Sequence, residues 1–386
     1  MRPLDPTLAG SGTTIFETMS GLARAHQAVN LGQGFPDERG PLVLREAGAR
    51  YLVEGHNQYP PMMGLPGLRQ AVARHARRWY GLEVDWEQEV LVTSGATEAL
   101  LDCFLALLAP GDEALVLEPA YDTYAPVIRR LGAVPVPVRL VPPTWDLPRA
   151  ELAAAITPRT KLVVLNTPMN PCGRVLPEDD LAWLAAQIVA HDLYAVCDEV
   201  YEHLVFAGAR HVPLMTLPGM RDRCARIGSA GKTFSLTGWK VGYVTAAPAL
   251  LRPIAKAHQF TTFTTPPNLQ HAVALGLDLD DAYFAGLAGT LERSRDRLAD
   301  GLRGLGLPVL PAEGTYFLVA DVAGWMRPGE DDQAFCRRLV VDAGVVVIPM
   351  SAFYLGAAPA SLVRFCFCKE DATIDAALER LRRWRG

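Results

Sequence analysis

The chain uses lysine so rarely that each lysine is a candidate for chemistry that arginine cannot do. Among its 37 basic residues only five are lysine, at positions 161, 232, 240, 256 and 369. A lysine amine can lose its proton and condense with a carbonyl, whereas a guanidinium stays protonated. Lys232 and Lys240 lie in one segment, 228–242, that is rich in Gly, Ser and Thr. We therefore expect amine chemistry in this segment.

Three further motifs follow apolar runs that are typical of buried strands. TSGATEAL at 93–100 joins a strand to a helix, and the backbone N–H groups of Gly95, Ala96 and Thr97 could hold a phosphate. NTPMNPCG at 166–173 is a turn whose two prolines fix the direction of the Asn170 amide. CDEVY at 197–201 ends a strand with Asp198, an acid that is costly to bury unless it meets a cation.

Together these motifs match the needs of one cofactor, pyridoxal 5′-phosphate. Its aldehyde needs an amine for a Schiff base, its pyridine nitrogen an acid, and its phosphate a set of donors. The chain offers a lysine, a strand-end aspartate, a tyrosine, a turn asparagine and a phosphate-binding turn. Ligands of open α/β sheets collect at the carboxyl ends of the strands, where these motifs fall.

Two commoner nucleotide motifs fail on their spacing, and no metal site is indicated. A Walker A loop ending at Lys232 needs glycine where Arg226 stands, and a dinucleotide fingerprint starting at Gly32 needs glycine or alanine where Asp37 stands. The eight histidines form no HExxH or similar spacing, and Cys366 and Cys368 lack a second pair. The seven cysteines are odd in number and mostly isolated, so we expect reduced thiols.

Alternating patterns predict an α/β fold around these motifs. Nearly continuous apolar runs predict strands buried on both faces, as in a mostly parallel sheet, at 90–93, 114–117, 162–166, 194–198 and 241–246. The segments between them carry helical patterns, which implies crossover connections. Thr14 and Glu17 form a capping box that predicts a short N-terminal helix.

The C-terminal third has a looser order of elements. A long helical stretch from about Ala282 leads to strand candidates around 316–320, 345–348 and 363–367, and Ile374, Leu378 and Leu381 share one face of a closing helix. We predict three parts: an N-terminal arm of residues 1–38 that joins the small domain, a large cofactor-binding domain of residues 39–281, and a small α+β domain of residues 282–386.

Composition excludes several other classes of protein. A chain of 386 residues with 50% hydrophobic and 20% charged residues can bury the core of two ordinary domains. The net charge of −5 and the absence of a basic run argue against nucleic-acid binding. No apolar run reaches the ~18 residues of a membrane span, and residues 1–6 lack the apolar segment of a signal peptide, so we expect a cytoplasmic protein.

Through nearly its whole length the chain resembles class I aminotransferases of the fold type I pyridoxal-phosphate enzymes. The segments SAGKTF at 229–234, TGWKVG at 237–242 and NLGQGFPD at 30–37 are similar to the branch that holds kynurenine aminotransferases (glutamine transaminase K) and methionine aminotransferases. The resemblance implies a three-layer α/β/α cofactor domain, a smaller α+β domain and a homodimer with shared sites.

The resemblance also implies the cofactor contacts. Lys232 would form the Schiff base and then act as the base that moves the substrate proton, while Asp198 would keep the pyridine nitrogen protonated. Tyr201 and Asn170 would hydrogen-bond the ring 3′ oxygen, and Tyr121 would stack on the ring. The phosphate would be held by Gly95, Ala96, Thr97, Ser229 and Lys240, with Tyr59 reaching over from the neighbouring subunit. Many family members have arginine where this chain has Lys240, and the lysine favours the kynurenine and methionine branch.

On the substrate side, Arg364 would clamp the α-carboxylate, assisted by Asn170 and the Gly34 backbone. Ile15, Tyr59, Tyr121 and Phe263 would form an apolar and aromatic wall, and the segment 258–264 that meets the neighbour's pocket holds no arginine. We therefore expect transfer of the amino group from a neutral or aromatic L-amino acid, of the methionine, glutamine, phenylalanine or kynurenine type, to a 2-oxo acid. Thr264 and Thr97 differ from some kynurenine-active relatives, which puts kynurenine itself in doubt.

Of two alternatives on the same cofactor, one remains open. A cysteine-conjugate β-lyase (C–S lyase) would use the same lysine, and it would release ammonia without a 2-oxo acid. A non-catalytic regulator that binds pyridoxal phosphate would need an additional DNA-binding domain or a basic face, and the sequence offers neither.

Overall fold

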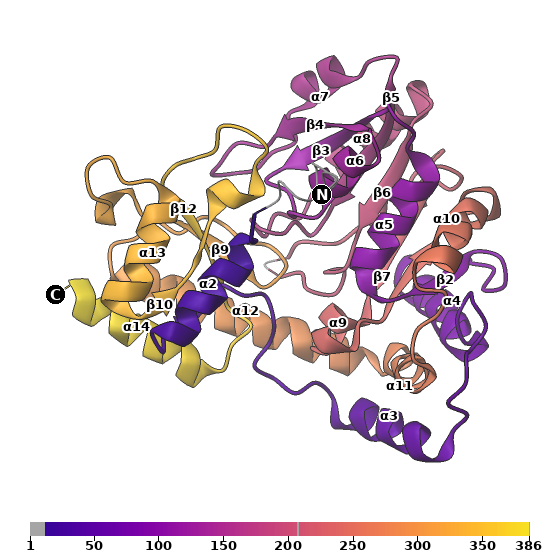
Figure 1. Ribbon diagram of the computed structural model, residues 1–386, viewed down its shortest axis with the longest axis horizontal. Helices are drawn as coiled ribbons and strands as arrows, with labels where there is room; N and C mark the ends of the chain where they lie inside the picture. Colours follow the sequence, from indigo (N-terminus) through magenta and orange to yellow (C-terminus); the bar gives the residue numbers. More distant parts are fainter. Residues whose placement is uncertain (1–11, 207, 386) are drawn as a thin grey trace, which may run out of the picture.

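The computed structural model describes residues 12–206 and 208–385. Residues 1–11 of the expected arm lie outside the described residues. Within the described chain, seven strands form the larger sheet in the order β2-β8-β7-β6-β5-β3-β4 (Figure 1). The strands are β2 Val90–Thr93, β3 Glu113–Glu118, β4 Val134–Arg139, β5 Thr160–Asn166, β6 Tyr194–Asp198, β7 Cys224–Ser229 and β8 Gly242–Thr245.

The larger sheet is mostly parallel, as the doubly buried apolar runs predict. Strands β4, β3, β5, β6 and β7 pair in parallel, while β8 runs antiparallel to its neighbours β2 and β7. Every residue of β2 and β3 is buried. The sheet therefore has no solvent face over these strands, and its carboxyl edge is free to carry the site.

The sequence prediction omits β4 and β7, each for a physical reason. β4 is an edge strand that contains Pro135 and Pro137, and proline is tolerated there because an edge strand leaves part of its N–H groups unpaired. β7 lies next to the middle of the sheet but contains Arg226, which interrupts the apolar run. Its guanidinium is buried and pairs with Glu199 at 2.6 Å, so the charge is accommodated inside the core.

Helices pack against the larger sheet. Helix α5, for example, packs against β6, β7, β8 and helix α10. The helices of this part are α3 Leu42–Glu54, α4 Pro66–Tyr80, α5 Gly95–Leu107, α6 Tyr124–Arg130, α7 Arg149–Ala155, α8 Glu178–Ala190, α9 Ala230–Thr233, α10 Pro248–Thr261 and α11 Pro267–Leu277.

A smaller antiparallel sheet, β11-β12-β9, lies apart from the larger one, and α12 (Asp281–Gly304) extends between the two (Figure 1). Its strands are β9 Phe317–Asp321, β11 Ile348–Pro349 and β12 Leu362–Cys366. The N-terminal segment joins this part, because β1 (Val29–Asn30) pairs in parallel with β10 (Val345–Val346). Helices α2 Ile15–Ala25, α13 Asp332–Ala343 and α14 Asp371–Arg385 pack around it.

The N-terminal helix begins as its capping box predicts. The Thr14 hydroxyl accepts a hydrogen bond of 3.2 Å from the Glu17 backbone N–H. The closing helix α14 likewise buries Ile374, Leu378 and Leu381. Helix α14 contacts β1 and β10, and α2 contacts β1, β10 and β11, so both helices pack on the smaller part of the chain.

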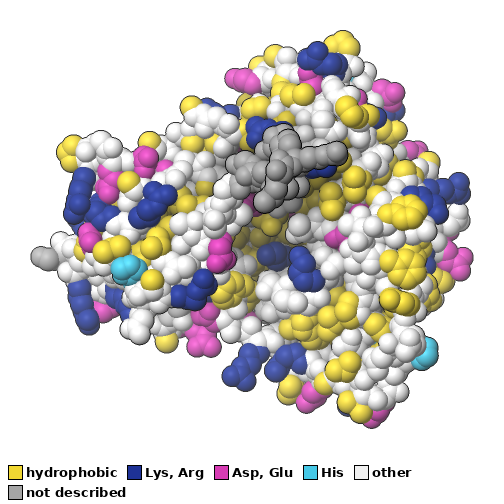
Figure 2. All heavy atoms as spheres, viewed as in Figure 1, with side chains coloured by type: hydrophobic (Ala, Val, Ile, Leu, Met, Phe, Trp, Pro, Cys, Tyr) yellow, Lys and Arg dark blue, Asp and Glu magenta, His cyan; other side chains and the backbone are white. Residues whose placement is uncertain are grey.

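The surface carries charges of both signs. On the face drawn in Figure 2 the basic and acidic side chains are interspersed, in keeping with the small net charge of −5. Among the described residues, no helix combines the length and the apolar character needed to cross a membrane.

Candidate active site

A pocket of about 420 Å³ lies where β5, β6 and β7 end and the smaller sheet faces them. The register explains the convergence, because Asn166 at the end of β5 pairs with Asp198 at the end of β6. The pocket collects most of the predicted site residues: Gly34, Gly95, Ala96, Thr97, Tyr121, Asn170, Asp198, Tyr201, Ser229, Lys232, Lys240 and Arg364. Segments separated by up to 330 residues in the sequence thus share one lining.

Lys232 lies in the short helix α9, directly after β7. Its Nζ donates a hydrogen bond of 2.7 Å to the Tyr316 hydroxyl, which in turn donates to the Gly34 carbonyl at 2.7 Å. Burial lowers the pKa of the Lys232 amine, because the charged form loses its hydration. A lysine in this setting reaches the neutral, nucleophilic form more easily than an exposed one.

Asp198 is buried and only half satisfied. Its Oδ2 accepts a hydrogen bond of 2.6 Å from the Tyr124 hydroxyl, whereas Oδ1 has no hydrogen-bond partner among the described residues. Burial raises the pKa of this carboxyl. Asn166 holds the backbone in place, since its side-chain amide donates to the Asp198 carbonyl at 2.7 Å. An unpaired carboxylate oxygen in the lining of a pocket is suited to a cationic N–H of a ligand.

The turn at the start of α5 is shaped to hold an anion. Gly95 has a φ of +76°, a left-handed conformation that favours glycine, and it starts a helix whose N-terminal N–H groups attract negative charge. A Cβ on Gly242 would lie 2.6 Å from the Gly95 carbonyl carbon, so only glycine lets β8 approach this turn. The Lys240 side chain borders Gly95, with Nζ 3.3 Å from the position of a Cβ there. These groups form a basic turn lined by backbone amides, which could hold a phosphate.

Arg364 lies at the other side of the pocket, in the middle of β12. Its two Nη atoms donate to the Asn170 side-chain oxygen at 2.8 Å and to the Gly32 carbonyl at 2.7 Å, while Nε has no partner among the described residues. Its guanidinium carbon lies 3.8 Å from the centre of the Phe317 ring. Burial lowers the pKa of Arg364 to about 10. Arg364 forms no ion pair with an acid among the described residues, so its guanidinium could bind a carboxylate that enters the pocket.

Three predicted residues are not in the lining of this chain's pocket. Phe16, the neighbour of Ile15 on α2, lines the pocket in its place. Tyr59 and Phe263 contact each other edge to face, with ring centroids 5.6 Å apart, and 82% and 40% of their surfaces are exposed. Both were expected to reach a neighbouring subunit, so a single chain leaves their role a prediction.

Sequence reasoning missed Tyr316, Tyr124 and Asn166 as site residues. Tyr124 stands three residues after Tyr121 in the motif EPAYDTY, and Asn166 is the last residue of a predicted strand, so both carried a signal. Tyr316 precedes β9 in the smaller sheet, more than eighty positions from Lys232, and nothing in its local sequence marks it.

The matching family model identifies the class of protein. The model "Aminotransferase class I and II" covers residues 26–381, and the chain belongs to this family, which uses pyridoxal phosphate. The fold is accordingly that of the fold type I aminotransferases, and the protein is an aminotransferase.

Particular relatives carry different substrate names. The chain is 46% identical to the probable N-succinyldiaminopimelate aminotransferase DapC of Mycobacterium tuberculosis over 96% of this chain and 95% of the relative. It is 42% identical to the methionine aminotransferase of Escherichia coli, with 96% of each chain covered. Human kynurenine–oxoglutarate transaminase 1 is 38% identical, with 94% of each covered. The solved structure of the M. tuberculosis N-succinyldiaminopimelate aminotransferase superposes with a TM-score of 0.96 at 44% identity, covering 99% of this chain and all of that one.

Proposed function

We propose that this aminotransferase binds pyridoxal 5′-phosphate in the pocket between Lys232 and Asp198. The observation that carries the proposal is the unpaired Oδ1 of buried Asp198, which lines the same pocket as the Lys232 amine. When bound, the cofactor supplies a carbonyl that condenses with amines and a ring that accepts the electrons released from the substrate Cα–H bond. Asp198 would hold the proton on the ring nitrogen, and the turn at Gly95 would bind the phosphate.

The remaining residues would position groups and move protons. Lys232 would hold the cofactor at rest and, once the substrate amine has displaced it, take the proton from the substrate Cα and return it to C4′ of the cofactor. Tyr121 would cover one face of the ring, while Tyr201 and Asn170 would hydrogen-bond its 3′ oxygen. The Tyr316 hydroxyl keeps the Lys232 amine near the pocket while it is free.

A labelling experiment tests the cofactor assignment. The purified holoenzyme should be yellow, and borohydride should attach the cofactor permanently to Lys232, because reduction turns an imine into a stable amine. Mass spectrometry of the labelled peptide reads the position. A label on Lys240 or Lys256 would refute the assignment, and a protein that binds no cofactor at all would refute the proposal.

For the substrate we infer a neutral or aromatic L-amino acid, of the methionine, glutamine, phenylalanine or kynurenine type. Among the described residues, the cations in the lining are Lys232, Lys240 and Arg364, and each already has a place at the carbonyl, the phosphate or the α-carboxylate. The lining contains Phe16, Phe35 and Phe317, and the rings of Phe16 and Phe317 lie against the Arg364 guanidinium. A side-chain carboxylate would be buried there without a partner.

The name of the DapC relatives raises a different substrate, N-succinyldiaminopimelate. That molecule brings carboxylates besides the one that Arg364 would bind, and the described lining has no further cation for them. We therefore rank it behind the neutral donors. A panel of methionine, glutamine, phenylalanine, kynurenine, aspartate and N-succinyldiaminopimelate with one fixed 2-oxo acid would decide. Aspartate or the succinylated donor in first place would overturn the inference and imply a cation from another chain.

Assays of a cysteine conjugate and of methionine, each with and without the 2-oxo acid, separate transamination from the C–S lyase alternative. A transaminase turns over only when a 2-oxo acid accepts the amino group, whereas a lyase releases ammonia from a cysteine conjugate without it. We expect turnover to stop when the oxo acid is withheld. Continued release of ammonia under that condition would make the lyase a true activity of this site.

We also propose that the enzyme is a homodimer with shared sites. Tyr59 and Phe263 contact each other, with 82% and 40% of their surfaces accessible in the single chain, and Phe260, three residues before Phe263, is 83% exposed. Exposed apolar side chains that lie together are suited to a contact with another chain. In the dimer, Tyr59 would reach the phosphate and Phe263 the substrate wall of the partner.

A further inference from the structure

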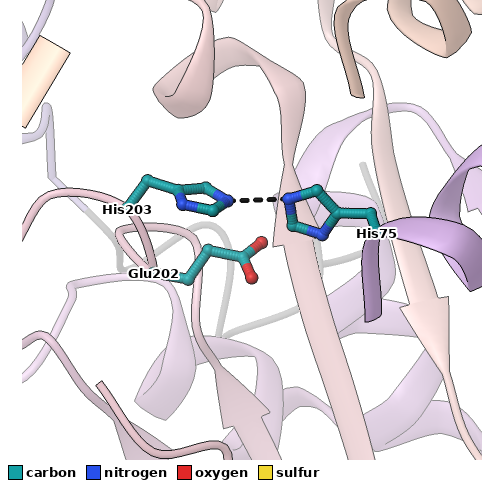
Figure 3. Close-up of side chains that lie close together, drawn as sticks. All are labelled: His75, Glu202 and His203. Atoms are coloured by element: carbon teal, nitrogen blue, oxygen red, sulfur yellow. Dashed lines mark hydrogen bonds between the residues drawn. The ribbon is translucent and has the colours of Figure 1, made fainter. Parts of the chain in front are cut away.

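Two buried clusters of histidine and acidic side chains lie outside the pocket lining. In the first, Figure 3 shows His75, Glu202 and His203 pointing toward one another. The two Nε2 atoms are 2.7 Å apart, and Glu202 accepts from the Tyr80 hydroxyl at 2.6 Å and pairs with Arg226. The histidine Nε2 atoms and the Glu202 carboxylate, which could otherwise ligate a metal ion, already have partners. The positive charge of Arg226 would also repel a metal ion. This cluster is a satisfied core network.

The second cluster joins Glu98 and Asp102 of α5 to His258 of α10. The Nδ1 atom of His258 lies 2.8 Å from Glu98 Oε1 and 3.7 Å from Asp102 Oδ2, and its Nε2 lies 3.1 Å from the Met62 carbonyl oxygen. His258 and Asp102 are fully buried. Neither oxygen of Asp102 has a hydrogen-bond partner among the described residues.

The partners of His258 determine its charge. A carbonyl oxygen only accepts hydrogen bonds, so the Nε2 atom facing Met62 must carry a proton. The Nδ1 atom faces the Glu98 carboxylate, which also accepts, and therefore carries a second proton. Burial opposes the charge on the ring, but the hydrogen bond and charge of Glu98, the charge of Asp102 and the Met62 carbonyl together outweigh it and raise the pKa of His258. The ring is thus an imidazolium between two acids.

The cluster of Glu98, Asp102 and His258 contacts two parts of the proposed shared site: the turn at Gly95 and the segments that carry Tyr59 and Phe263. On one side Glu98 accepts a hydrogen bond from the Ser94 backbone N–H, directly before the phosphate turn at Gly95. On the other side the His258 carbonyl accepts from the Phe263 N–H at 2.9 Å, and the Met62 carbonyl fixes the segment that follows Tyr59. Through its ring and its backbone carbonyl, His258 therefore connects the turn at Gly95 to the segments that carry Tyr59 and Phe263.

We propose that His258 is a positioning residue whose two ring nitrogens serve two different parts of the catalytic assembly. The Nδ1 side, through Glu98, orders the turn that receives the cofactor phosphate, and the Nε2 side, through Met62, orders the Tyr59 and Phe263 segment that reaches the partner's site. This assignment rests on the proposed function, because it requires that the turn bind a phosphate and that the dimer share its sites.

Two substitutions of His258 separate the two sides. In His258→Gln the amide nitrogen takes the place of Nε2 and can still donate to Met62, while the contact with Glu98 is lost. In His258→Asn the amide nitrogen takes the place of Nδ1 and can still donate to Glu98, while the contact with Met62 is lost. His191→Gln, on an exposed histidine, is the matched control. Each variant is purified as holoenzyme and compared in cofactor release rate, KM for methionine and Tm.

The expected result is a split between the two readouts. His258→Gln should release the cofactor about tenfold faster, as loss of a charge-assisted hydrogen bond implies, with KM near the wild-type value. His258→Asn should raise KM several-fold with cofactor release near wild type. Glu98→Gln should follow His258→Gln, and it supplies the test of the phosphate side if His258→Gln does not fold.

Other outcomes would overturn the assignment. If both His258 variants change release and KM in the same proportion as Tm, His258 contributes only general stability. If neither readout moves, the cluster does not act on the site. A wild-type protein that binds no pyridoxal phosphate would instead refute the proposed function, and this is seen before any variant is compared.

Discussion

The Lys232 amine and the Tyr316 hydroxyl are joined by a hydrogen bond of 2.7 Å that crosses from the larger part of the chain to the smaller. Because the Tyr316 hydroxyl donates its own proton to the Gly34 carbonyl, its oxygen can only accept from Lys232. The lysine is thereby held in the pocket, and Gly34, predicted to border the substrate carboxylate, is fixed by the same hydroxyl.

Tyr316→Phe tests this relationship, because it removes the hydroxyl and keeps the ring that packs edge to face on Tyr201 at 5.2 Å. We expect the unfolding free energy to fall by only about 1 kcal/mol, the net value of one hydrogen bond. The kcat of transamination should fall by about tenfold or more, because the free amine loses its anchor. Steady-state kinetics and denaturant unfolding give the two numbers, and an unchanged kcat would show that the hydroxyl is dispensable.

Asp198→Asn should slow Cα deprotonation far more than it destabilises the fold. The amide keeps the size of the carboxylate and can still accept from Tyr124, but it no longer holds a proton on the ring nitrogen by charge. A single-turnover measurement with methionine reads the deprotonation step. Reconstitution with an N1-methylated cofactor, whose charge is permanent, should restore part of the rate, and no recovery would contradict the role of Asp198.

Most strands of the larger sheet and most residues of the pocket lining could be predicted, because local sequence patterns indicate them. The apolar runs that end at Thr93, Asn166 and Asp198 mark strands by composition alone, and the turns after them hold the polar residues. Strand β7 gave no such signal, because a charged residue interrupts its apolar run. The charge of Arg226 inside β7 makes sense only beside Glu199 and Glu202, which lie on a different stretch of chain.

Tyr316 could not be predicted as a site residue because its role depends on a contact between distant segments. The partnership of Tyr316 with Lys232 depends on how the two parts of the chain meet, and no spacing encodes it. The choice between Ile15 and Phe16 also could not be made from the sequence. A helix turns by about 100° per residue, so which of these neighbours faces the pocket depends on how the helix packs. The structure turns Phe16 toward it.

Asp102→Asn should make stability less dependent on pH. Burial and the nearby Glu98 charge raise the pKa of Asp102 from 3.8 to about 7, with His258 the remaining charged group facing it. The folded protein therefore holds this proton more tightly than the unfolded chain, and stability falls as pH rises from about 4 to 7. The variant keeps a neutral group at every pH, so its Tm relative to wild type should rise between pH 4 and pH 8. A constant difference across this range would show that Asp102 does not titrate there.

Subunit mixing tests whether Tyr59 and Phe263 complete the partner's site. Lys232→Ala should be inactive, and Phe263→Ala should be strongly impaired, as single homodimers. A heterodimer of the two would contain one site with both residues intact, so mixing should regenerate up to half of the wild-type activity per heterodimer. Exchange is followed by native mass spectrometry, with Lys232→Ala mixed with itself as the control. Confirmed exchange without recovery would argue against shared sites.

Arg364→Lys should weaken all amino donors by a similar factor, because Arg364 is assigned to the carboxylate that every α-amino acid has. Lysine keeps the positive charge but cannot form the bidentate pair, and it cannot donate to both Asn170 and Gly32 in the same geometry. Loss of about 3 kcal/mol of charge-assisted hydrogen bonding corresponds to about a hundredfold in kcat/KM. The ratio of kcat/KM for methionine to that for aspartate should stay as in wild type, since no described cation in the lining is left to favour aspartate. A variant that loses methionine and phenylalanine but keeps aspartate would place Arg364 at the side chain of the substrate and reverse the assignment of the pocket.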